Sequence, residues 1–198
     1  MARRNRYFTQ GRLWHVTHRC HNREFLLRFA RDRDAYRSLL REKLVGSGVD
    51  LYAYCLTSNH VHLLFRCVEG ERIAPLMKSV AGEFAQTYNR RKRRSGAYWG
   101  DRYHATLVDS GEYLWRCLQY IDLNMVRAGQ VSHPSDWPWC GYHELIGRRK
   151  RYRLLNTAAL CETLGYRGEE TAFNSRYRES MNERIAGTDL ARENCWTE

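Results

Sequence analysis

Hydrophobic and polar positions follow regular spacings along the first two thirds of the chain. Strict alternation in "RLWHVTHRC" predicts a first strand over residues 12–20, because successive side chains of a strand point to opposite faces of the sheet. Apolar residues then recur at helical spacing over residues 31–45, and we expect a helix there. Its apolar stripe would consist of Ala35, Leu39, Leu40 and Leu44.

Two more strands and a second helix follow. The segments "VDLYAYCLT" and "HVHLLFRCV" have the composition of strands, and the turn-forming Ser58 and Asn59 between them predict a tight hairpin. A helix is expected over residues 72–92, with Pro75 in its first turn, where proline is tolerated. Its apolar side would consist of Ile73, Leu76, Met77, Val80, Phe84 and Tyr88, and it ends in the basic run "RRKRR".

A fourth strand and a third helix complete the regular part of the pattern. The segment "DRYHATLV" predicts the strand, and Asp109 with Glu112 resembles a capping box that opens a helix, which Gly129 would close. The order is therefore βαββαβ followed by a helix. With both earlier helices on one face of an antiparallel sheet, this order predicts an α+β, ferredoxin-like fold.

The pattern weakens after Gly129. The segment "HPSDWPWCGYHELIG" predicts irregular structure packed back onto the domain, and "NTAALCETLGY" is typical of a short helix. We therefore predict one domain over residues 1–129 and a C-terminal extension over residues 130–198 that packs on it. The sequence contains no internal repeat.

The charge balance of the chain favours nucleic acid as a partner. The chain of 198 residues is 43% hydrophobic, enough for a core, and its 33 Lys and Arg against 22 Asp and Glu give a formal charge of +11. Such a balance favours an anionic partner. No segment approaches the roughly 18 apolar residues of a membrane span, so no membrane association is expected. The start, "MARRNRYFTQ", lacks the apolar core of a signal peptide, and we expect a cytoplasmic protein.

The seven cysteines, Cys20, Cys55, Cys67, Cys117, Cys140, Cys161 and Cys195, include no C-x-x-C pair. Several lie in apolar runs, so we interpret them as buried free thiols and not as disulfides or a zinc cluster. The missing C-x-x-C also argues against a zinc deaminase, whose signature combines it with H-x-E. Here the corresponding pair is H-x-H.

The H-x-H pair is His60 and His62, within "TSNHVHLLF". Side chains two apart in a strand project to the same face with Cβ atoms roughly 7 Å apart, close enough to share one ion through imidazole nitrogens. On its own the pair is weak evidence, since two half-buried or exposed histidines without a metal explain it as well. A third ligand would favour the metal site.

The third predicted helix offers such a ligand in "QYIDLNMVRAG". At helical spacing Tyr120 and Asn124 are i and i+4 neighbours on the shoulder of an apolar stripe. Taken separately, each is also explained as packing or as a satisfied polar group. Tyr113 shares the shoulder but has Cys117 at i+4, so only Tyr120 pairs a phenol with an oxygen ligand. The stripe itself consists of Leu114, Cys117, Leu118, Ile121, Met125 and Ala128.

The order "SNHVHLLF" and then "YIDLNMVRAG" resembles the His-hydrophobic-His single-tyrosine transposases, and specifically their REP-associated tyrosine transposase branch. The segments "WHVTHRCHNREFLL", "YWGDRYHATLVDS" and "DWPWCGYHELIG" are similar to other parts of that family, so the likeness covers residues 10–147. One departure is Met125, where the family usually has proline after the asparagine. That change affects the last turn of the helix more than the site.

The resemblance implies a nuclease and strand transferase that acts on single-stranded DNA with palindromic hairpins, with residues 1–129 as the catalytic domain. Tyr120 would attack a phosphodiester and form a 5′-phosphotyrosine, releasing a 3′-OH. His60, His62 and Asn124 would hold a divalent ion, and two imidazoles with an amide suit Mg²⁺ or Mn²⁺ better than a closed zinc site. The resemblance also leaves a homodimer open.

Other basic and aromatic residues give further expectations. We expect phosphate contacts from the two basic runs, although solvated loops would explain them too, and Arg102 with His104 could approach DNA from one face of the fourth strand. The first run consists of Arg90, Arg91, Lys92, Arg93 and Arg94, and the second of Arg148, Arg149, Lys150 and Arg151.

Trp137 and Trp139 could stack on unpaired bases, although core packing is the preferred interpretation. His15 and His18 are three apart in a predicted strand and so face opposite ways, and we interpret both as structural.

Two other classes of function remain at this point. A basic ferredoxin-like domain could be a non-catalytic module that binds single-stranded DNA or RNA, although "HVHLLFRCV" lacks the aromatic pattern of an RRM. A metal-dependent hydrolase that needs no tyrosine is the other. A covalent protein–DNA adduct distinguishes the transposase from both.

Overall fold

The structure is a computed structural model that describes residues 8–69, 71–187 and 190. Its elements follow the predicted order of strands and helices. They are β1 (Leu13–Arg19), η1 (His21–Arg23), α1 (Ala30–Leu44), β2 (Val49–Leu56), β3 (His60–Cys67), α2 (Ile73–Lys92), β4 (His104–Val108), α3 (Glu112–Asp122), α4 (Asn124–Arg127), η2 (Pro134–Asp136), α5 (Tyr142–Leu145), α6 (Thr157–Thr163) and α7 (Glu170–Ala186).

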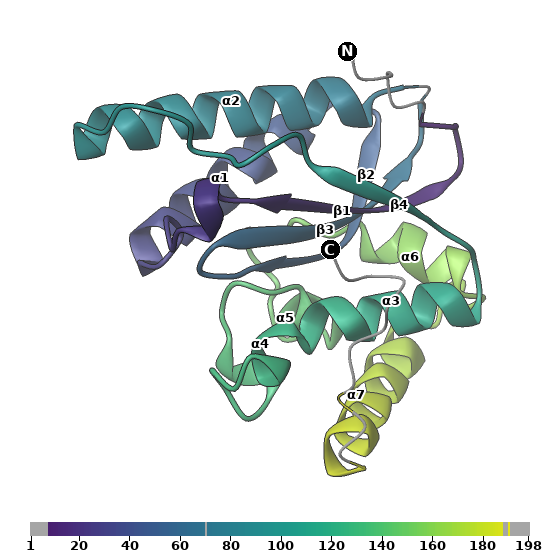
Figure 1. Cartoon of the computed structure of the whole chain (residues 1–198). Coiled ribbons are helices and arrows are strands. Elements are labelled where there is room, and N and C mark those ends of the chain that lie inside the picture. Colours follow the sequence, from purple (N-terminus) through teal and green to yellow (C-terminus); the bar gives the residue numbers. More distant parts are fainter. Residues whose placement is uncertain (1–7, 70, 188–189, 191–198) are drawn as a thin grey trace.

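The four strands form one antiparallel sheet in the order β2-β3-β1-β4. Helices α1 and α2 cover one face of this sheet, and α3 lies across the other face with α5 and α6 (Figure 1). The α+β, ferredoxin-like prediction is therefore confirmed. The two central strands, β1 and β3, carry His15, His18, His60 and His62.

Strand register determines which histidines share a face. In the β1–β3 pair Thr17 lies opposite His62 and His15 opposite Leu64, so His15 and His62 are diagonal neighbours on one face. His18 is on the opposite face, where its ring stacks on Trp99 at 4.0 Å between centroids. The α3 side of the sheet thus holds His15, His60 and His62 together.

The helix on that face differs from the prediction at both ends. Its N-cap is Gly111, with a φ of 69° and no side-chain cap, while Asp109 accepts a hydrogen bond from Arg12 at 3.2 Å. The predicted capping box is therefore wrong, because the Asp109 carboxylate has a cationic partner on a neighbouring segment. At the other end the helix is interrupted at Leu123, before α4 and Gly129, and Ala128 is exposed.

The buried side of helix α1 differs slightly from the predicted apolar stripe. Ala35 is exposed, and the aromatic Tyr36 is fully buried in its place beside Leu40. Burying the larger apolar surface is the favourable choice. The apolar side of α2 is buried as predicted over Ile73, Leu76, Met77, Val80, Phe84 and Tyr88.

The segment after Gly129 packs along the outer edge of the sheet. Leu56 N–H donates to Trp139 O at 2.9 Å and Gly141 N–H donates to Tyr54 O at 2.8 Å, so this segment protects the edge of β2. Six cysteines are buried free thiols, as interpreted from the sequence, and Cys195 lies outside the described residues.

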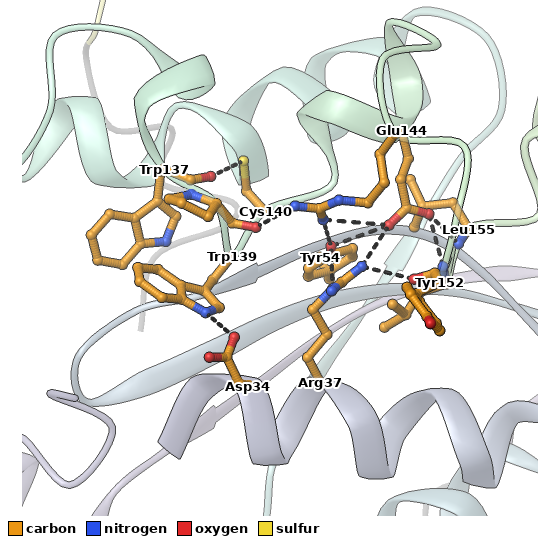
Figure 2. Close-up of polar contacts among 12 residues, drawn as sticks. Asp34, Arg37, Tyr54, Trp137, Trp139, Cys140, Glu144, Tyr152 and Leu155 are labelled. Atoms are coloured by element: carbon orange, nitrogen blue, oxygen red, sulfur yellow. Dashed lines mark hydrogen bonds and ion pairs between the residues drawn. The ribbon is translucent and has the colours of Figure 1, made fainter. Parts of the chain in front are cut away.

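A buried carboxylate fastens this segment to the sheet. Glu144 Oε2 accepts hydrogen bonds from Leu154 N and Leu155 N at 2.8 and 2.9 Å, and Tyr54 Oη donates to Oε1 at 3.2 Å. Arg37 reaches from α1 toward the same group, as Figure 2 shows, with its guanidinium 3.7 Å from Glu144 Oε1. The side chain of Glu144 is fully buried, so its charge depends on these partners.

Replacing Glu144 by alanine is therefore expected to lower the free energy of unfolding by about 3–5 kcal/mol, because it leaves the buried N–H groups of Leu154 and Leu155 without an acceptor and removes the negative charge that Arg37 faces. Urea unfolding followed by circular dichroism measures this. Glu83→Ala is the matched control: its carboxylate pairs with Lys43 at 2.8 Å but is 49% exposed, and we expect a loss below about 1 kcal/mol. Equal losses in the two variants would contradict the role given to Glu144.

Candidate active site

His62 lies at the centre of the polar cluster on the α3 side of the sheet. It is 3% exposed, and its Nδ1 is 3.0 Å from Nε2 of His15. Its other nitrogen, Nε2, is 2.8 Å from Nδ2 of Asn124 on α4. Since the amide nitrogen is a donor, Nε2 of His62 accepts, and the Nδ1 proton is donated to His15. With the Asn124 amide in this orientation, His62 carries its proton on Nδ1.

The protein keeps His62 neutral. Burial is the main cause that lowers the pKa of His62 well below its usual value, and the neighbouring His60, His15, Arg127 and Arg19 add to the shift. At neutral pH the ring therefore has a lone pair on Nε2. A neutral imidazole with its second N–H held by a partner is the form that ligates metals.

His60 has the same tautomer for a different reason. It is the first residue of β3, where its Nδ1 lies 2.7 Å from Asn59 Oδ1 and 2.9 Å from Thr57 Oγ1. The Asn59 amide is oriented because its nitrogen donates to Arg23 O at 3.1 Å. Nδ1 of His60 thus donates, which makes Nε2 the basic nitrogen. The rings of His60 and His62 are 4.7 Å apart between centroids.

Tyr120 lies on α3 against this cluster and is 5% exposed. Its ring centroid is 5.9 Å from that of His62 and 5.9 Å from that of His15, with edge-on geometry in both cases. The guanidinium of Arg127 lies over the ring of Tyr120 at 4.2 Å and also donates to the Tyr120 carbonyl. The structure thus brings Tyr120, Asn124, His60 and His62 together, as the family resemblance implied.

The side chains of the cluster can be compared with the ligands that a divalent ion requires. Within the described part of the chain, no group of three or more His, Cys, Asp and Glu side chains is arranged to hold a metal. A site made by His60, His62 and Asn124 would combine two imidazoles with an amide, whose oxygen and nitrogen exchange places on rotation. These residues fit an ion that takes its remaining ligands from water and from the substrate's phosphate oxygens.

His15 was interpreted as structural and was not placed at the site from the sequence; Arg19 and Arg127 were not predicted as site residues. His15 belongs to the cluster through its contact with His62, while Arg19 pairs with His60 across β1 and β3. Alternation places His15 on one of the two faces of its strand. Only the register between strands shows that His62 shares that face.

A cavity of about 720 Å³ opens beside the cluster. It adjoins two of the candidate ligands, His60 and Asn124, and is otherwise aromatic, polar and cationic. The remaining lining residues are Phe25, Arg28, Arg33, Thr57, Ser58, Asn59, Met125, Ala128, Gln130 and Trp137.

The first basic run divides into exposed and internally paired residues. Arg90, Lys92 and Arg93 are exposed at the end of α2. Arg91 forms an ion pair with the buried Asp32, and Arg94 donates to Ala97 O at 2.9 Å. The structure therefore leaves three of these five side chains directed to solvent, and their contact with DNA stays a prediction.

The second basic run also divides into exposed residues and one internally paired residue. Arg148, Lys150 and Arg151 are exposed, whereas Arg149 donates to Tyr54 Oη at 2.8 Å and to Pro138 O at 2.9 Å.

The expectation that Arg102 and His104 share a strand face is wrong, because β4 begins at His104. Arg102 instead lines a cavity with α2 residues and His18. His104 pairs with Thr17, two strands from His62 on the same face.

The two tryptophans are anchored at their indole nitrogens. Trp137 Nε1 donates to Leu56 O at 3.1 Å. Trp139 Nε1 donates to Asp34 Oδ1 at 2.7 Å, as Figure 2 shows. Both are half-buried and pack against the core, in agreement with the preferred interpretation. Trp137 nevertheless also lines the cavity beside the cluster.

Comparisons with known proteins agree with this arrangement. A family model described as IS200-like transposase matches residues 10–124. A protein of Haemophilus influenzae described as a REP-associated tyrosine transposase is 26% identical over 155 residues, which is 72% of this chain and 86% of that protein.

A solved structure of a REP-associated tyrosine transposase bound to a REP hairpin has the same fold, with a TM-score of 0.64 and 20% identity, covering 75% of this chain and 87% of that one. The resemblance drawn from the motifs is thus confirmed. No helix among the described residues is long and apolar enough to cross a membrane.

Proposed function

This chain belongs to the IS200-like transposase family, and we propose that it cleaves and rejoins single-stranded DNA carrying palindromic hairpins through a 5′-phosphotyrosine. The observation that supports this most directly is the position of Tyr120 against the His62–Asn124 pair. A phenol beside two imidazoles and an amide that could hold a divalent ion is placed as a nucleophile toward a phosphate bound at that ion.

In the cleavage step the Tyr120 hydroxyl oxygen attacks phosphorus. A tyrosyl–phosphate bond forms, the bond between phosphorus and the 3′ oxygen breaks, the phenol proton passes to solvent, and the leaving oxygen takes up a proton as a 3′-OH. A phenol with a usual pKa near 10 is a poor nucleophile at neutral pH, and the phosphodiester repels attack. Mg²⁺ or Mn²⁺ held by His60, His62 and Asn124 would polarise the phosphate and orient the scissile bond.

The residues around the nucleophile hold it in place. Arg127 spans the interruption at Leu123, since its guanidinium contacts both the ring and the carbonyl of Tyr120. His15 holds His62 in the tautomer that has its lone pair on Nε2. Arg127 and Arg19 lie near enough to His62 to affect its pKa, and their positive charge would stabilise the charge that develops on a phosphate bound there.

Strand transfer follows from the same chemistry in reverse. The phosphotyrosine conserves the energy of the broken bond, so a 3′-OH can attack it, release Tyr120 and restore a phosphodiester without ATP. The direct test is incubation of the protein with labelled hairpin DNA and Mn²⁺, followed by a denaturing gel. A covalent adduct is expected; cleavage without an adduct would instead indicate a hydrolase, and binding without either would indicate a non-catalytic module.

The exposed residues of the first basic run give a separate prediction. Replacing Arg90, Lys92 and Arg93 by serine should flatten the slope of log affinity against log salt by about 0.7 per lost phosphate contact on single strands. Discrimination between hairpins should change little, because phosphate contacts position the strand and base contacts read it. A salt titration of binding for wild type and variant measures both.

Arg91→Ser is the matched control for that titration. Its side chain is paired with buried Asp32, so its loss should lower stability and leave the salt slope unchanged. If the plots of log affinity against log salt have the same slope for wild type and the triple variant, the run makes no phosphate contacts.

A further inference from the structure

The cavity beside the cluster has a definite position relative to the reacting groups. Among the described residues that line it are the candidate ligands His60 and Asn124, but not the candidate nucleophile Tyr120. The nucleophile and the leaving group lie on opposite sides of phosphorus in an in-line displacement. Of the candidate ligands, His60 and Asn124 adjoin the cavity, while Tyr120 does not, and this is the arrangement expected of the leaving side.

We infer that this cavity binds the unpaired base of the nucleotide that carries the leaving 3′ oxygen. The inference rests on the proposed function, because it uses attack by Tyr120 to define the leaving side. At about 720 Å³ the cavity is within the roughly 300–1,000 Å³ of small-ligand sites, enough for one nucleotide.

The lining has the chemistry of a base-stacking site. Phe25 is 67% exposed at the cavity, and Trp137 forms part of its wall. Every nucleobase has a π face, so aromatic side chains bind unpaired bases regardless of sequence. Among the described lining residues two are arginines, Arg28 and Arg33, and none is Asp or Glu. That charge balance favours a nucleotide with its phosphate over a cationic ligand.

Arg33 provides a second observation. It is 6% exposed, and its Nη1 donates to Leu27 O and Arg28 O at 2.8 and 2.9 Å. Its guanidinium lies 4.7 Å from the ring centroid of Trp137 and 3.9 Å from that of Trp139, so it helps to hold the aromatic wall in place. The Nε donor is buried without a hydrogen-bond partner. An unsatisfied buried donor is costly, and an acceptor atom of a bound nucleotide would remove that cost.

The test combines a protein change with a DNA change. The two DNA changes are an abasic site immediately 5′ of the cleaved bond, at the leaving nucleotide, and an abasic site immediately 3′ of it. The protein change is Phe25→Ala, with Phe29→Ala as the matched control because Phe29 is also exposed (57%) but does not line the cavity. Adduct formation is measured as kcat/KM with each combination, and affinity is measured in a Tyr120→Phe background.

The 5′ abasic site is expected to slow wild type by about 5- to 150-fold, equivalent to 1–3 kcal/mol for one stacked base. Phe25→Ala should be slower on intact DNA but lose most of its sensitivity to the 5′ abasic site, because the two changes remove the same contact. Phe29→Ala should keep the full sensitivity. Trp137→Ala should behave like Phe25→Ala and serves as a second variant at the cavity wall.

Additive effects of Phe25→Ala and the 5′ abasic site would overturn the inference while leaving the proposed function intact, since the adduct still forms. If Phe25→Ala instead lost its sensitivity to the 3′ abasic site, the cavity would bind the nucleotide on the other side of the cleaved bond, and the inference would be wrong. A wild-type protein that forms no adduct on intact hairpin DNA would refute the proposed function and, with it, the inference, since no leaving nucleotide would then exist.

Discussion

Replacing Tyr120 by phenylalanine is expected to abolish the covalent protein–DNA adduct and leave hairpin binding within a factor of about two. The change removes only the hydroxyl, so the ring keeps its contacts with His15, His62 and Arg127. Loss of the nucleophile in enzymes with covalent intermediates costs on the order of 10⁶ in rate. Adduct formation on a denaturing gel and hairpin affinity by fluorescence anisotropy are the two measurements.

Tyr113→Phe is the matched control for this experiment. Tyr113 lies on the same helix but is 52% exposed, and its loss should leave the adduct unchanged. If Tyr120→Phe still formed the adduct, another residue would be the nucleophile. If Tyr120→Phe lost hairpin binding as well, the tyrosine would contribute to recognition and the loss of adduct would say nothing about chemistry.

The second large effect concerns the candidate ligands. His60→Ala and His62→Ala should each reduce cleavage by on the order of 10³-fold or more, and excess chelator should do the same to wild type, because the phosphate then loses its Lewis acid. Asn124→Ala should cost less, about 10- to 100-fold, because an amide is a weak ligand and water can replace it. Cleavage rates over a range of Mn²⁺ concentrations distinguish weakened binding from lost chemistry.

Two controls distinguish the loss of a metal ligand from misfolding of the variant: a histidine outside the cluster is replaced, and metal binding is measured directly. His143→Ala removes a half-buried histidine on α5, outside the cluster, and should retain activity. Mn²⁺ binding, followed by electron paramagnetic resonance, should weaken in His60→Ala and His62→Ala and should tighten when hairpin DNA supplies phosphate oxygens. Full activity of wild type in excess chelator would remove the metal from the mechanism.

Several parts of the site follow from local periodicity. Residues two apart in a strand share a face, which places His60 and His62 together, and residues four apart in a helix share a side, which places Tyr120 beside Asn124. These relations depend on backbone geometry within a few residues. They hold even though the helix is interrupted at Leu123, because the interruption leaves both side chains turned toward the sheet.

The amino-acid sequence by itself thus determined the order of elements, the ferredoxin-like class, and the two pairs His60–His62 and Tyr120–Asn124, which the family resemblance joined into one group. It also pointed to the family, because the motifs occur in a fixed order. Only the tertiary structure decided which neighbours complete the group. His15 joins it through the register of β1 on β3, which is set by hydrogen bonds between segments distant in sequence.

The same distinction applies to charge. In the sequence Arg91 and Arg149 look identical to the exposed arginines beside them, but a buried carboxylate lies near each one in the fold: Asp32 for Arg91, and Glu144 for Arg149. A buried charge requires a partner, so these pairs form wherever folding brings the carboxylate and the guanidinium together. Periodicity is a local property that a sequence displays, whereas pairing across the core depends on which distant segments meet.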